Sequence, residues 1–332
     1  MNVPLSRDRL VELLDRVRGK RILVIGDAML DVYLSGDVER ISPEAPVPVV
    51  RVRERTHALG GAANVAHNVV AIGAACDLVA AVGADRAGGT LREMLRALGA
   101  GDDSVVTVDR ATTQKTRVLA RGQQLVRVDE EDDADFSHAE TAPVLERVRT
   151  AIATADAVVL EDYNKGVLVP EVFAEVMRLA HERSLPVVVD PKYHNFFLYR
   201  GATIFKPNVR ELEAALGAAV DVDHPETLPA TLVRLGVEHI LLTLGERGMV
   251  LFSDRGEIAR VPTAARAVYD VVGAGDTVTA YLATMVAAGS TVAEAAVIAN
   301  VAAGIEVGKL GAATVSVTEV LAYVDSHAPA NA

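Results

Sequence analysis

The sequence predicts an α/β protein with three layers, in which helices cover both faces of a mainly parallel sheet. The first observation is a set of short runs rich in Val, Ile and Leu that stop at Asp, Gly or Glu: 21–27, 76–83, 157–162, 186–191 and 239–245. The second is that amphipathic patterns, such as those at 88–99 and 170–184, separate these runs. Apolar strands that alternate with helices are typical of a parallel sheet buried on both faces.

The acids at the ends of these runs are the first candidates for a site. Asp27, Asp162 and Asp190 each follow a predicted strand. Open parallel sheets bind their ligands beyond the carboxyl ends of the strands, so these three carboxylates fall where a site is expected. Aspartate also favours loops and helix caps, and each of them has that second interpretation.

Two segments, 33–61 and 112–132, break the alternation of strands and helices. Both are rich in Val and Arg and lack a helical period, and the first carries three prolines, which favour an edge or exposed position. We expect antiparallel strands of a small separate sheet, which would serve as a lid or an interface.

Composition bounds the function. The chain has 332 residues, of which 50% are hydrophobic, and its 33 basic and 45 acidic residues give a net charge of −12. That charge disfavours a nucleic-acid-binding protein, which should show a basic surface. Cys76 is the only cysteine, which fits a reduced compartment.

The sequence also bounds the location. The first 20 residues are charged and amphipathic, unlike a signal peptide, and the longest uncharged stretch, 277–293, is interrupted by Gly289 and Ser290. We therefore predict a cytoplasmic protein with no membrane partner.

The stretch "DVVGAGDTV" at 270–278 predicts a turn that enters a helix. Gly273, Ala274 and Gly275 would let the backbone approach a ligand, and the helix N-terminus would offer unpaired N–H groups to an anion. Asp276 would then lie beside that anion. The alternative is that Asp276 only caps the helix.

Two other glycine-containing stretches have the same double interpretation. In "GGAANVAHN" (60–68), a glycine pair leads into a helix, and Asn64 either caps it or holds a sugar hydroxyl. In "LLTLGERGMVL" (241–251), a strand ends at Thr243 and Gly245, which indicates a hairpin turn, a contact with nucleotide phosphates, or both.

In "KPNVRELE" (206–213), Asn208 and Glu211 stand three residues apart at a predicted helix start. This spacing is that of a capping box. It also places an amide oxygen and a carboxylate on one face, where they could hold water around Mg²⁺.

Several common motifs are absent. The Gly-Lys pair in 304–310 lacks P-loop spacing, and no G-x-G-x-x-G follows the first strand. The histidines show no zinc-binding spacing, and no G-x-S-x-G elbow is present.

Together these motifs, in this order, resemble the PfkB family of ribokinase-like carbohydrate kinases. The resemblance runs from "GDAMLD" (26–31) to "KLGAATV" (309–315) and is most specific at 270–278 and 60–64. It implies transfer of a phosphoryl group from ATP to a sugar hydroxyl. It also implies one kinase domain, 1–332, with lid segments at about 33–57 and 112–130.

The resemblance implies a role for each matching residue. The catalytic base would be Asp276, and the anion hole would be formed by the backbone of Gly273, Ala274 and Gly275. The sugar-hydroxyl clamp would comprise Asp31, Gly60, Gly61 and Asn64. Mg²⁺ and phosphates would involve Asn208 and Glu211, the nucleotide phosphates Thr243, Gly245 and Gly248, and the adenine pocket Asn300 and Ala303.

Four segments are similar to one branch of the family: 40–50, 116–129, 161–166 and 189–192. That branch comprises the D-glycero-β-D-manno-heptose-7-phosphate kinases of lipopolysaccharide precursor synthesis, which phosphorylate the anomeric hydroxyl. Many of these kinases are fused to an adenylyltransferase domain. Because this chain ends soon after the kinase helices, we expect a stand-alone kinase.

A phosphorylated substrate requires basic groups at the far end of the pocket. The candidates are Lys165, Lys192, Arg117 and Arg121, each of which could instead be a solvated surface charge. The resemblance also implies a homodimer formed through the lid, and it leaves K⁺ activation through the loop 308–314 open. The alternatives are a kinase for another sugar, a nucleoside kinase, or a silent sugar-binding protein of the same fold.

Overall fold

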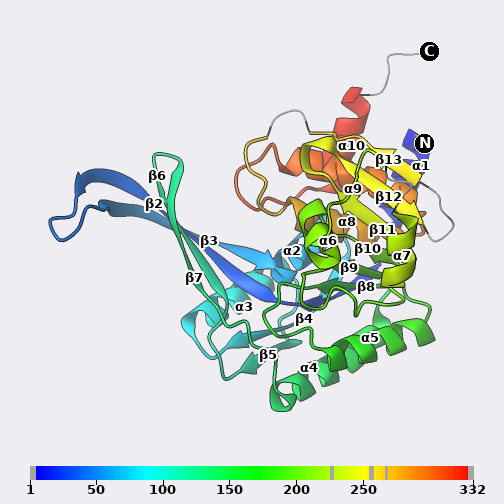
Figure 1. Ribbon diagram of the computed structural model, residues 1–332, viewed down its shortest axis with the longest axis horizontal. Helices are drawn as coiled ribbons and strands as arrows, with labels where there is room; N and C mark the ends of the chain where they lie inside the picture. Colours follow the sequence, from blue (N-terminus) through cyan, green and yellow to red (C-terminus); the bar gives the residue numbers. More distant parts are fainter. Residues whose placement is uncertain (1–4, 225–227, 254–257, 266–267, 328–332) are drawn as a thin grey trace.

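The computed structural model describes residues 5–224, 228–253, 258–265 and 268–327. Its large sheet is parallel from β11 to β5, and β12 and β13 add two antiparallel strands at one edge (Figure 1). The strands, from one edge to the other, are β13 (Ile258–Val261), β12 (Met249–Ser253), β11 (His239–Thr243), β10 (Ile204–Phe205), β9 (Val187–Asp190), β8 (Ala157–Glu161), β1 (Arg21–Gly26), β4 (Ala75–Gly83) and β5 (Val105–Val108).

Helices cover both faces of this sheet, as the alternation of runs predicted. Side chains alternate along a strand, so Ile22 and Val24 of β1 pack into one apolar core while Leu23 and Ile25 pack into the other. The first core is closed by α1 (Arg7–Arg16), α2 (Ala62–Ile72), α3 (Arg86–Leu98), α8 (Ala274–Ala287), α9 (Val292–Glu306) and α10 (Val317–His327). The second is closed by α4 (His138–Ala151), α5 (Pro170–Glu182), α6 (Val209–Leu216) and α7 (Pro229–Leu235). Among the described residues, no helix combines the length and apolar character that crossing a bilayer requires.

The two segments that break the alternation form a second, four-stranded sheet, which projects from the body of the molecule (Figure 1). We call this sheet the lid. Its strands, in spatial order, are β3 (Pro48–Gly61), β2 (Ala28–Ile41), β6 (Gln114–Ala120) and β7 (Gln123–Glu130).

The lid corrects one expectation. Its strands pair antiparallel within each hairpin, but β2 and β6 pair parallel, so the sheet is mixed. The connection from β3 to β6 passes through the body of the molecule, and β6 therefore returns to the lid in the same direction as β2. In addition, β2 starts at Ala28, directly after the first strand of the large sheet, so the lid is continuous with the strand ends.

The parallel register brings polar residues to one edge of the large sheet. Gly26 pairs with Glu161, and Glu161 pairs with Asp190, at the carboxyl ends of β1, β8 and β9. Lys206 follows the end of β10, which is the next strand. The base of the lid and the start of α8 lie at this same edge, and this edge holds the candidate site.

Candidate functional site

The start of α8 has the geometry expected of an anion site. Gly273 is the N-cap, with φ 95° in the left-handed region, and Ala274, Gly275 and Asp276 form the first helical turn. A Cβ on Gly273 would lie 3.1 Å from Asn64 Nδ2 and 3.2 Å from the Ala312 Cα atom. Glycine is therefore required here both by the backbone conformation and by space.

Asp276 is 6% exposed and is held by two hydrogen bonds. Asn64 Nδ2 donates to its Oδ2 at 2.6 Å, and the Tyr163 hydroxyl donates to its Oδ1 at 3.2 Å. Burial raises the pKa of Asp276 to about 6, and the charge of Asp190 acts in the same direction, whereas the bond from Asn64 lowers it. A carboxylate with a pKa near neutrality is suited to accept a proton from a hydroxyl group.

Next to Asp276 lies a buried group of charges that the sequence motifs did not single out as a unit. Oxygens of Glu161, Asp190 and Asp276 lie within 4.8 Å of one another. Lys206 Nζ, almost fully buried, pairs with Asp190 Oδ2 at 2.7 Å. Burial opposes charge on Lys206, but Asp190 and Glu161 raise the pKa of its ammonium group. An ammonium group paired with Asp190 therefore lies beside the start of α8, where a Cβ on Gly275 would lie 3.7 Å from Lys206 Nζ.

Glu161 is the least satisfied member of this group. It is completely buried, and neither carboxylate oxygen has a hydrogen-bond partner among the described residues. Burial and the neighbouring carboxylates raise its pKa well above the usual range. Such a group has unused capacity for a ligand hydroxyl or a hard cation. Its position at the end of β8, beside Asp162, was the only sequence signal that could have identified it.

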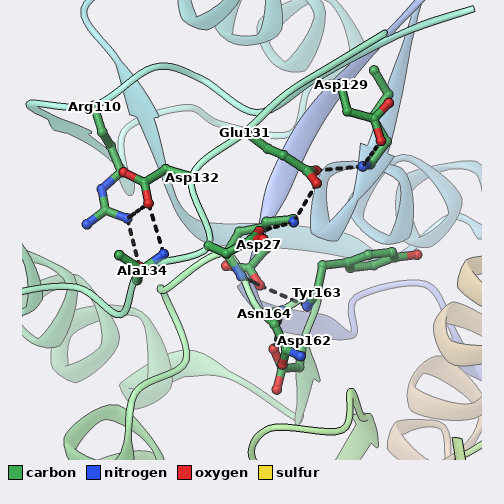
Figure 2. A network of polar contacts seen from close by, with 12 residues as sticks. Asp27, Arg110, Asp129, Glu131, Asp132, Ala134, Asp162, Tyr163 and Asn164 are labelled. Carbon is green, nitrogen blue, oxygen red and sulfur yellow. Dashed lines mark hydrogen bonds and ion pairs between the residues drawn. The ribbon is translucent and has the colours of Figure 1, made fainter. Parts of the chain in front are cut away.

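The other two strand-end acids stabilise a loop instead. Asp27 accepts backbone N–H bonds from Tyr163, Lys165 and Val167 at 2.8, 3.0 and 3.2 Å, and Asp162 accepts one from Asn164 (Figure 2). For Asp27 and Asp162 the structure thus supports the loop interpretation. This loop places the Tyr163 hydroxyl on Asp276.

The predicted sugar clamp is assembled at the base of the lid. Asp31 is buried and pairs with the Arg117 guanidinium. A Cβ on Gly60 would lie 3.0 Å from Asp31 Oδ2, and one on Gly61, where φ is 56°, would lie 2.4 Å from the Asp27 carbonyl oxygen. The structure therefore brings together the clamp residues that the sequence predicted, although the amide of Asn64 is directed at Asp276.

The four basic candidates are placed differently from one another. Arg117 and Lys165 lie on the lid side of the clamp, where Lys165 Nζ pairs with Glu131 and Asp133. Lys192 Nζ pairs with Glu211 at 2.6 Å and lies 5.0 Å from the centre of the Tyr163 ring. Arg121 is in the exposed turn between β6 and β7. It is six residues further along the chain than Lys115, which corresponds to about 20 Å along an extended strand. Within this chain, Arg121 therefore lies far from the other three basic candidates and from the clamp.

On the other side of the α8 start is a cavity of about 620 Å³. It is lined by six of the predicted nucleotide residues and by part of the anion hole: Asn208, Thr243, Gly245, Gly248, Asn300, Ala303, Ala274 and Gly275. Apolar walls come from Val268, Val271, Val278 and Val307. The volume and the mainly apolar lining suit a small organic ligand.

At the mouth of this cavity, Asn208 and Glu211 form a complete capping box. Asn208 Oδ1 accepts from the Glu211 N–H, and Glu211 Oε2 accepts from the Asn208 N–H, each at 2.9 Å. The capping interpretation is therefore correct. The capping box uses Glu211 Oε2, whereas Oε1 bonds Lys192. The role of Glu211 in binding Mg²⁺ stays a prediction.

The geometry thus places one buried carboxylate between a nucleotide-sized cavity and a polar clamp. The model of the pfkB family carbohydrate kinases matches residues 20–319. The chain belongs to the PfkB family of carbohydrate kinases. It is an ATP-dependent sugar kinase, and the family predicted from the sequence is confirmed.

Two relatives are bifunctional proteins named HldE. The one from Citrifermentans bemidjiense is 43% identical over 323 residues, which are 96% of this chain and 66% of the relative. The one from Rhodospirillum rubrum is 43% identical over 324 residues, 95% of this chain and 64% of the relative. This PfkB-family chain therefore spans about two thirds of the length of these proteins.

Solved structures confirm the ribokinase-like fold. Arabidopsis thaliana ribokinase, complexed with ribose and ATP, matches with a TM-score of 0.73 at 22% identity, over 92% of this chain and 98% of its own. Phosphofructokinase-2 from Escherichia coli, in complex with potassium, matches with a TM-score of 0.76 at 19% identity, over 92% of this chain and 99% of its own. At these identities the likeness shows the fold alone.

Glu211 provides a test of the metal prediction in this kinase. We expect Glu211→Gln to raise the Mg²⁺ concentration for half-maximal activity about threefold or more, because one negative charge near the metal is removed while glutamine preserves the capping box. A Mg²⁺ titration of initial rates measures this. Glu294→Gln is the matched control, since Glu294 also closes a capping box, with Thr291, and pairs with Arg9. If both variants required the same Mg²⁺ concentration for half-maximal activity, Glu211 would act only as a helix cap.

We expect Glu306 to make the stability of the kinase depend on pH. Both of its carboxylate oxygens are buried without a hydrogen-bond partner among the described residues. Burial, with the charges of Asp270 and Asp276, raises its pKa from the ordinary 4.5 to about 8. Above pH 4.5 the unfolded chain releases this proton while the folded chain retains it, so stability falls as pH rises toward 8.

Glu306→Gln should remove this pH-dependent loss. We expect its Tm to exceed that of the wild type by about 3 °C or more at pH 8, with the difference closing as pH approaches 4.5. Thermal unfolding across this pH range measures the effect. A difference that is constant with pH would show that the carboxyl group is not held protonated.

Proposed function

We propose that this kinase transfers the γ-phosphoryl group of ATP to the anomeric C1 hydroxyl of D-glycero-β-D-manno-heptose 7-phosphate. The products would be the 1,7-bisphosphate and ADP, in the cytoplasmic synthesis of lipopolysaccharide precursors. The observation that carries the proposal is the position of Asp276, which lies between the 620 Å³ cavity and the clamp around Asp31. The 43% identity to HldE proteins over 96% of this chain supports the choice of sugar.

The mechanism follows from the position of each group. Asp276 takes the proton of the C1 hydroxyl, whose oxygen forms a bond to the γ-phosphorus while the bond to the β,γ-bridging oxygen breaks and ADP leaves. The backbone N–H groups at Gly273–Gly275 and the positive end of α8 stabilise the charge on the transferring group. Lys206, held by Asp190, adds a positive charge at the same place. Phosphoryl transfer needs positioning and electrostatic stabilisation of this kind.

Asn208 and Glu211 are the residues proposed to hold Mg²⁺, through water, at the mouth of the cavity. Their fit rests on Glu211 Oε1, which the capping box does not use and which bonds Lys192, and on the carboxylate and amide oxygens that this hard cation prefers. When bound, the metal would neutralise charge on the nucleotide phosphates.

A K⁺ site beside the anion hole is also part of the proposal. Asp270 connects the two loops concerned, because Oδ1 accepts from the Val272 N–H and Oδ2 from the Gly311 N–H. The E. coli phosphofructokinase-2 structure, of the same fold, contains potassium. Dependence of initial rates on KCl, with choline chloride at matched ionic strength, tests this part.

We propose that the whole chain forms one kinase domain and that two copies pair through the lid. Large apolar side chains are exposed on its strands and on the loop between β2 and β3: Ile41, Val47, Val52, Leu125, Val126 and Val128. A surface of this kind favours association with another protein surface. Sedimentation velocity would show a dimer, and a Val52→Glu, Val126→Glu double variant would shift the kinase to monomer.

ADP release with ATP and Mg²⁺ across a panel of acceptors tests the proposed substrate. The panel comprises the heptose 7-phosphate, sedoheptulose 7-phosphate, fructose 6-phosphate, ribose and adenosine. We expect the highest kcat/KM for the heptose phosphate. Preference for another sugar would preserve the roles of Asp276 and the anion hole but remove the heptose branch. No ADP with any acceptor would favour a silent sugar-binding protein.

A further inference from the structure

The basic side chains on the lid side of the sugar clamp are already neutralised by carboxylates. Lys115 and Arg117 stand two residues apart on β6, so they share one face of the lid, and Lys115 is paired in register with Asp31 of the clamp. Arg117 bonds Asp31, Lys115 bonds Asp129 and Glu131, and Lys165 bonds Glu131 and Asp133. Each of the three cations is thus paired with at least one carboxylate, and Asp129 is also bonded by Arg127.

Glu131 is the centre of this network (Figure 2). Its Oε2 lies 2.7 Å from Lys115 Nζ, and its Oε1 lies 3.0 Å from Lys165 Nζ. The exposed fractions of the three side chains are 15% for Lys115, 13% for Lys165 and 23% for Glu131. Although burial opposes ionisation, the bonds from the two lysines hold the pKa of Glu131 below its usual value. An ionised carboxylate thus bridges two ammonium groups with its two oxygens.

Two sets of contacts connect this bridge with the position that we propose for the acceptor. Lys165 belongs to the loop that Asp27 organises, in which Tyr163 is two residues earlier. The Tyr163 hydroxyl bonds Asp276, and the other lysine is in register with Asp31. An acceptor whose hydroxyl faces Asp276 therefore has the bridged lysine pair on its lid side.

A phosphate group on the acceptor could bind the same two ammonium groups, because two of its oxygens can replace the two oxygens of one carboxylate. Both anions cannot occupy the position together, because two negative groups at contact distance repel each other. Of the two carboxylates that bond Lys115, Glu131 is the one more able to leave. It follows the last residue of β7, outside the strand ladder, whereas Asp129 lies within β7 and is also bonded by Arg127.

We propose that Glu131 occupies the subsite of the acceptor's phosphate group and is displaced by it, so that Lys115 and Lys165 pass from the carboxylate to the phosphate. This makes Glu131 a specificity-determining residue. A sugar without phosphate leaves the bridge intact, whereas a phosphorylated sugar exchanges one anion for another and releases the end of β7. The inference rests on the proposed function in that the acceptor carries a phosphate at its far end.

Glu131→Gln tests the displacement, because it removes the competing charge and preserves the shape of the side chain. We expect the KM for the heptose 7-phosphate to fall about fivefold, with the KM for ATP unchanged. Glu130→Gln is the matched control: Glu130 is the exposed neighbour, bonded by Gln114, and its variant should match the wild type. Lys115→Met should raise the KM for the phosphosugar about tenfold. A KM in Glu131→Gln that is unchanged or higher would overturn the inference.

A second measurement does not depend on the identity of the sugar. Inorganic phosphate at millimolar concentration should raise the Tm of Glu131→Gln more than that of the wild type or of Glu130→Gln, because the lysine pair no longer has a competing carboxylate charge. Equal Tm shifts in the three proteins would contradict the displacement. If the wild type does not phosphorylate the heptose phosphate but phosphate still stabilises Glu131→Gln selectively, the proposed substrate fails and the subsite stands.

Discussion

Replacement of Asp276 by Asn is expected to lower kcat by about 10²–10⁴-fold while ATP still binds. Asparagine retains the size of the side chain and a hydrogen-bonding group for Asn64 and Tyr163, but it cannot accept the hydroxyl proton. The cavity that we assign to ATP lies on the other side of the α8 start and is lined by other side chains. Steady-state assays measure the loss of kcat, and calorimetric titration with ATP measures whether the nucleotide still binds.

The control for Asp276→Asn is Asp8→Asn, which removes one carboxylate from the first turn of another helix, α1, and should retain full turnover. The wild-type pH profile provides a second check. The base must be ionised, so kcat/KM should fall as pH decreases through about 6, the raised pKa of Asp276. Near-normal turnover of Asp276→Asn would show that another group accepts the proton.

Replacement of Gly273 by Ala is expected to lower kcat by about 10²–10³-fold. The added methyl group would lie 3.1 Å from Asn64 Nδ2 and 3.2 Å from Ala312, so the turn that presents its N–H groups to the phosphoryl group must shift. The left-handed backbone also costs an alanine about 1–2 kcal/mol, which should lower the Tm. Steady-state kinetics and thermal unfolding measure the two losses.

Gly289→Ala distinguishes these two causes. Gly289 has φ 90°, close to that of Gly273, but its Cβ would meet only Arg16 Nη1, at 3.6 Å. This variant should lose a similar amount of stability and retain its kcat. If both variants lost activity equally, the effect at Gly273 would reflect general destabilisation and not the anion hole.

The sequence was sufficient for the parts of the site that are local in the chain. The turn at Gly273, the capping box at Asn208 and the strands of the large sheet all depend on residues a few positions apart, and their patterns predicted them. The roles assigned to those residues came from the family resemblance. The structure brings most of them together around the start of α8, beside the 620 Å³ cavity.

The sequence could not supply the parts that depend on which strands are neighbours. Glu161 and Lys206 gain a role only because β8, β9 and β10 are adjacent, which places both side chains next to Asp190. The parallel pairing of β2 with β6 likewise depends on the path of the chain between them. No local pattern specifies these contacts, so the buried charge cluster and the mixed lid sheet were not predicted.

The sequence also did not predict which carboxylates pair with the basic candidates. The basic candidates were chosen by residue type, but their availability depends on partners that are distant in the chain, such as Asp31 for Arg117 and Glu211 for Lys192. Only the folded structure shows that the lysine pair around Glu131 is bridged.

Transfer of phosphate to C1 of a heptose 7-phosphate can be tested by identifying the product. The kinase is incubated with the heptose 7-phosphate, ATP and Mg²⁺, and the product is examined by phosphorus NMR with correlation to sugar protons. We predict a second phosphate resonance, coupled to the anomeric proton H1. A new phosphate coupled to any other proton, or no second phosphate while ADP forms with a different sugar, would contradict it.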